Sequence, residues 1–132
     1  MGFTNPWFEP CWNDVQVVPL GDNLTMRILK VTSYLATKIA AFSQRGGNDW
    51  YSSKDIEDIV TVIAGRQTLP DDVLYSSSPA RSSVIEWFRT LQALNSEAGG
   101  DIVRAHLDPE LAASAEYAQK SESAIRQIAS LV

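Results

Sequence analysis

The sequence has few of the residues that build metal sites and covalent cross-links. It contains one cysteine, Cys11, and one histidine, His106, among 132 residues. A single cysteine cannot form an internal disulfide, and no Cys/His cluster with the spacing of a zinc site is present. No serine is placed with His106 and an acid in the manner of a catalytic triad. We therefore expect no metal site and an inert Cys11.

Long apolar runs and basic charge are also scarce. No apolar run approaches about 18 residues, and the N-terminus lacks the basic start and apolar stretch of a signal peptide, so we expect a cytoplasmic protein without membrane contact. The formal net charge is −5 and the pI is about 4.7. This charge argues against general nucleic-acid binding, because phosphate backbones require a basic surface. A small local basic pocket remains compatible with it.

The remaining composition is that of one globular domain, with 45 % apolar and 20 % charged residues. Residues 1–31 are predicted to form an irregular, aromatic-rich N-terminal segment (the lead-in) followed by a β-hairpin. Its strands are expected at 14–20 and 24–31, on either side of the turn signal Gly21-Asp22-Asn23. Residues 32–132 read as helical. The prediction is a single domain of the α+β class, mostly α, with a four- to six-helix bundle after the hairpin.

Apolar periodicity and caps place the helices. We expect a helix from residue 32 to about 44, one at 54–64, and a short one beginning near Pro70. Further helices are expected at 79–95, at 101–106 and from 109 onward. Val84, Trp87, Phe88, Leu91 and Leu94 should point inward from the helix at 79–95.

Five charged residues between positions 38 and 58 have the order expected of a binding site: Lys38, Arg45, Asp49, Asp55 and Asp58. Lys38 lies between the apolar stripe of its helix and the outer face, among small alanines. A lysine with so little bulk around it can reach a phosphate or a carboxylate. The alternative is a lysine whose stem covers apolar surface while its ammonium group stays in water.

The aspartates also have structural alternatives. Asp55 and Asp58 project from neighbouring positions of one helix. Asp58 lies near the core and needs a partner, which Lys38 or Arg45 could supply. Asp55 fits a capping box with Ser52, where an acid in the first turn is favoured. Asp49 follows two glycines and an asparagine, so it can serve simply to shape a turn.

The stretch YLATKIAAFSQRGGNDWYSSKDIEDIVTVIAGR, residues 34–66, resembles a bacterial group of nucleotidyltransferase-fold proteins, the AbiEii/AbiGii toxin-like group. That group carries a helix motif like F-L-A-T-K-x-E-A-F, then R-G-x-x-D, then S-x-D-x-E-D-I and a closing G-R. The resemblance extends back to MGFTNPW at the start of the chain and weakens after about residue 66. Two positions depart from the motif, because Ala40 stands where glutamate is common and Lys54 where histidine is common.

The resemblance implies roles for the charged residues. Lys38, Arg45 and Asp49 correspond to the side of a cleft that contacts nucleotide phosphates, and Lys38, Asp55 and Asp58 are the catalytic candidates. In this fold the metal-binding carboxylates, including a D-x-D pair, lie upstream on the first strands. The chain has no D-x-D sequence. It therefore resembles the C-terminal half of such a domain.

The expected function follows from that missing half. The chain should be inactive alone and act as a binding or interaction module, or else form half of a split, toxin–antitoxin-related nucleotidyltransferase completed by a partner chain. Mg²⁺ and a nucleoside triphosphate are expected only if the partner supplies the missing carboxylates. The hairpin edge and the aromatic N-terminus are the expected contact surface, either in a homodimer or with that partner, because open strand edges favour pairing.

Overall fold

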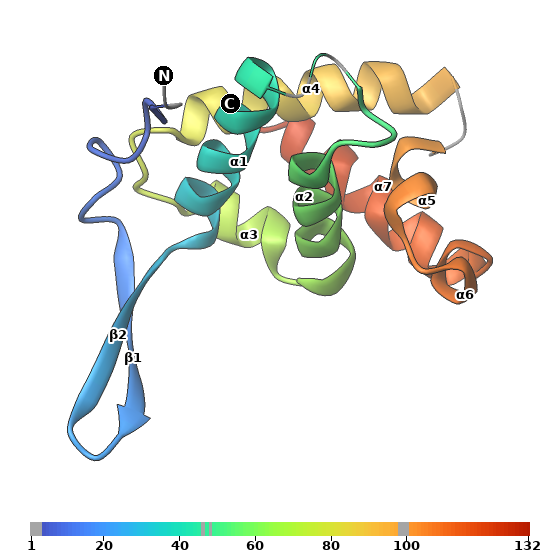
Figure 1. The fold of residues 1–132 in the computed structure, drawn as a ribbon. Coiled ribbons are helices and arrows are strands. Elements are labelled where there is room, and N and C mark those ends of the chain that lie inside the picture. The colour runs from blue at the N-terminus through green and yellow to red at the C-terminus, as the bar shows by residue number, and fades with distance from the viewer. Residues whose placement is uncertain (1–3, 46, 48, 98–100) are drawn as a thin grey trace.

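The computed structural model describes residues 4–45, 47, 49–97 and 101–132. It confirms the α+β, mostly α class, with a two-stranded hairpin followed by helices (Figure 1). The strands are β1 (Val15–Gly21) and β2 (Leu24–Leu29). The helices are α1 (Val31–Arg45), α2 (Lys54–Gly65), α3 (Leu69–Leu74), α4 (Arg81–Glu97), α5 (Asp101–His106), α6 (Pro109–Ala112) and α7 (Ala115–Ala129).

The hairpin extends from the helical body as an arm, with its turn far from the helices (Figure 1). β1 and β2 pair antiparallel, with Val18 opposite Met26, and the register shifts between Pro19 and Gly21. The turn requires positive φ at Gly21 (92°), Asp22 (44°) and Asn23 (63°). Glycine, aspartate and asparagine tolerate this conformation better than other residues, which explains why this turn signal was readable in the sequence.

Helix α1 lies at the centre of the structure. Leu35 and Phe42 are buried on its apolar stripe, and the small residues Ala36, Ala40 and Ala41 are buried beside them. Because alanine side chains are small, neighbouring helices can approach this face closely, and α1 contacts α2, α3 and α4. The alanines that were expected to surround Lys38 with open space are therefore part of the packing.

A short series of polar contacts fixes the root of the hairpin to the helices. The Ser33 hydroxyl donates to Asp14 Oδ2 over 2.5 Å and lies 2.7 Å from the Ser78 hydroxyl. The backbone N–H of Lys30 donates to the Asp14 carbonyl over 2.9 Å. Cys11 is fully buried, with its sulfur 3.8 Å from Ser78 Oγ. These contacts join the N-terminal segment, the start of α1 and the loop before α4, with the side chain of Cys11 buried between them.

Two helical predictions differ from the structure. The helix expected from residue 109 onward is divided into α6 and α7, because Asp108 caps the first turn of α6 and Ser114 begins a second helix. Leu94 was expected to point inward, but its side chain is 44 % exposed. It lies near the end of α4, beyond Leu91, which is buried. Among the described residues, no helix has the length and apolar character needed to cross a membrane.

Truncation of two α4 residues tests where the core ends. Phe88 is fully buried, so we expect Phe88→Ala to lower the free energy of unfolding by about 3–5 kcal/mol. Leu94→Ala is the matched control on the same helix and should change the stability by less than about 0.5 kcal/mol. Chemical denaturation monitored by circular dichroism measures both values. Similar losses for the two variants would show that the core extends past Leu91.

Candidate functional site

Lys38 and Asp58 form an ion pair between α1 and α2. Lys38 Nζ lies 2.8 Å from Asp58 Oδ2, and the two side chains are 27 % and 24 % exposed. Lys54 approaches the other oxygen of Asp58 at 3.5 Å. The ammonium group of Lys38 also lies 5.8 Å from the ring centre of Tyr34. The sequence had left two partners open for Asp58, namely Lys38 and Arg45. In the structure the partner is Lys38.

Arg45 and Asp55 form a second bridge between the same helices. Arg45 donates from Nε (3.1 Å) and Nη2 (3.0 Å) to the two oxygens of Asp55, whose side chain is only 4 % exposed. The capping-box role expected for Asp55 is not found. Ser53 caps α2 instead, accepting from the N–H of Ile56 over 3.3 Å. Both oxygens of Asp55 are engaged by Arg45, in a bidentate and charge-assisted contact.

Asp49 shapes the turn before α2. Its Oδ1 accepts hydrogen bonds from the backbone N–H groups of Tyr51 (3.2 Å) and Ser52 (3.1 Å). The backbone N–H of Ser52, which a capping box would pair with Asp55, therefore already donates to Asp49. A hollow of about 350 Å³ opens beside this turn and is lined by Arg45, Asp49, Ser52, Ser53, Lys54 and Asp55. The structure thus brings Arg45, Asp49 and Asp55 together around one hollow, whose lining does not include Lys38 or Asp58.

The electrostatics of the Lys38–Asp58 pair favour the charged forms of both residues. The hydrogen bond to Asp58 raises the pKa of Lys38 above its ordinary value of 10.5, although burial opposes this. Burial raises the pKa of Asp58, but the hydrogen bonds and positive charges of Lys38 and Lys54 outweigh it and hold that pKa below 3.8. A lysine held in this way is a poor general base, because it stays protonated at neutral pH.

The single histidine of the sequence is also engaged in a hydrogen bond. His106 Nε2 lies 2.6 Å from the carbonyl oxygen of Trp50. Within the described part of the chain, no three His, Cys, Asp or Glu side chains gather as a metal site would require. The described charged residues therefore join α1 to α2 through two ion pairs.

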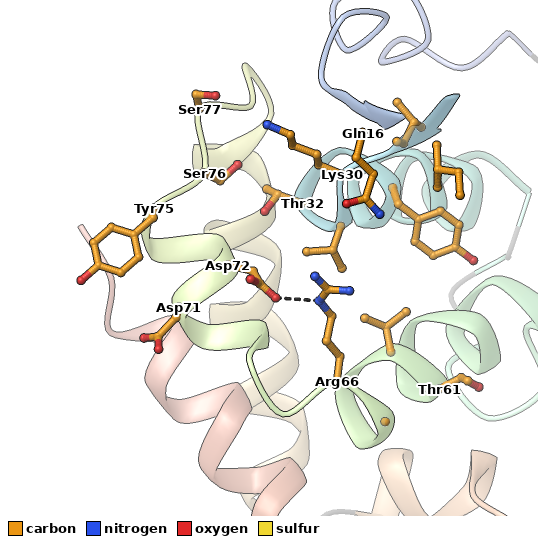
Figure 2. A pocket seen from close by; sticks show the side chains of 16 residues that line it. Gln16, Lys30, Thr32, Thr61, Arg66, Asp71, Asp72, Tyr75, Ser76 and Ser77 are labelled. Carbon is orange, nitrogen blue, oxygen red and sulfur yellow. Dashed lines mark hydrogen bonds and ion pairs between the residues drawn. The ribbon is translucent and has the colours of Figure 1, made fainter. Parts of the chain in front are cut away.

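A larger cavity lies elsewhere, where no site had been predicted. It measures about 800 Å³ and is bounded by the base of the hairpin, the start of α1, the end of α2, and α3 with the loop after it (Figure 2). Lys30, Thr32 and Arg66 are among its lining residues. Of its lining residues, Arg66 had drawn attention in the sequence, as part of the Gly-Arg pair that closes the motif at the end of α2. The other walls come from distant segments and show no common motif.

The Lys38–Asp58 pair predicts how stability depends on pH. Because the folded pKa of Asp58 is below 3.8, its contribution is present above that value and is lost as the pH falls through the folded pKa. Because the folded pKa of Lys38 is above 10.5, its contribution is present below that value and is lost as the pH rises through the folded pKa. Asp58→Asn should flatten both limbs of a plot of Tm against pH.

The control for this measurement is Asp22→Asn at the exposed hairpin turn, which should retain the wild-type profile. The same acid and alkaline limbs in Asp58→Asn and in the wild type would contradict a stabilising role for the pair. Differential scanning calorimetry across the pH range gives the required Tm values.

Comparison with known proteins found no matching family model, no matching curated protein and no matching solved structure.

Proposed function

We propose that the protein is an interaction module that associates with a second copy of itself through the hairpin arm, and that it does not transfer nucleotides alone. The exposed apolar surface of the arm carries this proposal. It consists of the partly buried Val18 and the exposed Leu20, Leu24 and Met26, and we call it the arm surface. Leu20, Leu24 and Met26 are 56 %, 64 % and 48 % exposed.

The arm is an unusual place for so many apolar side chains. Exposed apolar patches mark contact surfaces in otherwise well-packed proteins, and a lone two-stranded hairpin is only marginally stable in water. The arm projects away from the helices (Figure 1), so the body does not cover the side chains near its turn. Covering the arm surface would therefore bury apolar area and stabilise the strands together.

A second copy is the occupant that fits this surface. Two arms related by a two-fold axis cover each other with one self-complementary contact and give four strands where each chain has two. β2 offers an edge without proline, whereas β1 contains Pro19, which cannot donate to a neighbouring strand. Of the N-terminal aromatics, Phe8 (58 %) and Trp12 (70 %) are exposed and can add to the contact. Trp7 packs against the core.

Neighbouring substitutions in β2 test self-association. Met26→Lys places a charge in the arm surface and should convert the dimer to a monomer, because an unpaired buried charge is costly. Thr25→Lys is the matched control, since adjacent strand residues point to opposite faces. Light scattering after size exclusion should give about twice 14.6 kDa for the wild type and Thr25→Lys, and 14.6 kDa for Met26→Lys. A monomeric wild type at high concentration would refute the proposal.

A second candidate is one half of a split nucleotidyltransferase. The hollow beside Arg45 and Asp49 favours it, because these two residues lie on the phosphate side implied by the resemblance. A partner chain would have to supply the carboxylates for Mg²⁺, since the described residues offer no such cluster. Lys38 is already engaged with Asp58, so we assign it to the scaffold in either case.

Two measurements decide between binding and catalysis. The purified chain with Mg²⁺ and each labelled nucleoside triphosphate should incorporate no label into itself or an RNA acceptor. Lys38→Met should lower Tm, because it leaves the partly buried Asp58 without its closest partner. It should leave any nucleotide affinity measured by calorimetry unchanged.

Lys120→Met removes a surface ion pair with Glu116 and is the control for the loss of charge. Incorporation of label by the chain alone would overturn the assignment of an inactive module. Loss of nucleotide affinity in Lys38→Met, with Tm unchanged, would return Lys38 to the phosphate side of a cleft.

A further inference from the structure

We propose that the cavity between the hairpin base and α3 binds a small organic anion, with a phosphate or carboxylate head and an apolar body. Its volume of about 800 Å³ lies in the range of small-molecule sites, which typically hold a few hundred to about 1,000 Å³. This site is separate from the hollow beside Asp49 and does not depend on the self-association proposed above. Its ligand class follows from the side chains that line it.

Arg66 supplies the first positive group. Asp72 Oδ2 accepts from Arg66 Nε at 2.6 Å and also accepts from the Thr68 hydroxyl at 2.8 Å. Only Nε is engaged among the described residues, and Figure 2 shows the terminal nitrogens of the guanidinium group directed into the cavity. Asp72 thus fixes the orientation of the Arg66 guanidinium group, whose two Nη groups can bind a phosphate or a carboxylate.

Lys30 supplies the second positive group from the opposite wall. Its side chain extends toward the loop that carries Ser76 and Ser77 (Figure 2). Its ammonium group forms no ion pair with any described residue. Asp71 also borders the cavity, but Figure 2 shows its carboxylate pointing away on the far side of α3. With Asp72 bound to Arg66, the interior presents two cations and one engaged carboxylate to a ligand.

Thr32 provides an independent sign of a binding site. It lines the cavity and is only 1 % exposed, yet its hydroxyl has no hydrogen-bond partner among the described residues. A buried hydroxyl without a partner is destabilising, and an anionic oxygen bound beside it would accept its hydrogen bond. Thr32 lies in the first turn of α1, which has no acidic residue and carries the positive end of a 15-residue helix. Asp14, which accepts from Ser33, is not part of the cavity wall.

The remaining wall determines the body of the ligand. Leu29, Val31, Tyr34 and Val62 give the cavity an apolar side, and Gln16 places an amide at its edge (Figure 2). An inorganic ion would leave this apolar side in water, whereas a ring or short chain attached to the anionic head would cover it. Phenyl phosphate and benzoate are therefore suitable probes, and they distinguish a phosphate head from a carboxylate head.

Titration of the full chain by two-dimensional NMR tests the proposal. Phenyl phosphate or benzoate should shift the amide signals of cavity residues, while benzyl alcohol should not, and inorganic phosphate should bind more weakly than phenyl phosphate. Arg66→Gln and Lys30→Gln should each weaken binding of the better anion by about tenfold or more, as expected for a lost charge-assisted hydrogen bond. Arg104→Gln, at an exposed position, is the control and should bind like the wild type.

Thr32→Val separates a ligand contact from a structural role. It removes the unpartnered hydroxyl, so it should raise or preserve Tm and still weaken anion binding. Met26→Lys should bind the probe normally, so a failed dimer and a failed cavity give different results. The proposal is overturned if no cavity signal shifts at probe concentrations up to about 10 mM. Equal binding of benzyl alcohol, or full affinity in both Arg66→Gln and Lys30→Gln, would overturn it as well.

Discussion

Close packing around α1 is the constraint on which the rest of the structure depends. Its buried alanines allow α2 and α4 to approach, and its first residues are buried although they are polar. Asn5 donates to the carbonyl oxygen of Thr37 over 2.7 Å, so the N-terminal segment is also attached to this helix. The hairpin root, the two interhelical ion pairs and one wall of the cavity all take their positions from α1. A larger side chain at Ala36 or Ala41 would therefore disturb several features together.

Local signals made much of the fold predictable. Gly21-Asp22-Asn23 specifies a turn because few residues tolerate positive φ, and the apolar spacing of Leu35 and Phe42 specifies a buried helical face. The break between α6 and α7 was missed because Ser114 begins a helix inside a stretch without proline or glycine. Leu94 was misplaced because periodicity does not reveal where neighbouring helices end.

The charged residues of the candidate site could be picked out from the sequence, but which lysine or arginine pairs with which aspartate could not. The spacing of Lys38, Asp55 and Asp58 cannot distinguish a lysine that awaits a phosphate from one that already contacts a carboxylate. That difference depends on how α1 lies against α2, which places Lys38 at Asp58 and Arg45 at Asp55. The cavity was less predictable still, since its walls come from Gln16 and from some of the residues in the separate segments 28–34, 61–66 and 71–77. Only the folded chain brings Arg66 and Lys30 to the same space.

The continuity of the two strands connects the arm to the cavity. Gln16 and Ile28 line the cavity and are paired with each other, while Val18 and Met26, two residues further along the same strands, belong to the arm surface. The Asp14–Ser33 contact holds the root of these strands against α1. The same two strands therefore form a wall of the cavity at their root and an exposed surface near their turn. A substitution at the root would disturb both places, whereas one near the turn leaves the wall of the cavity in position.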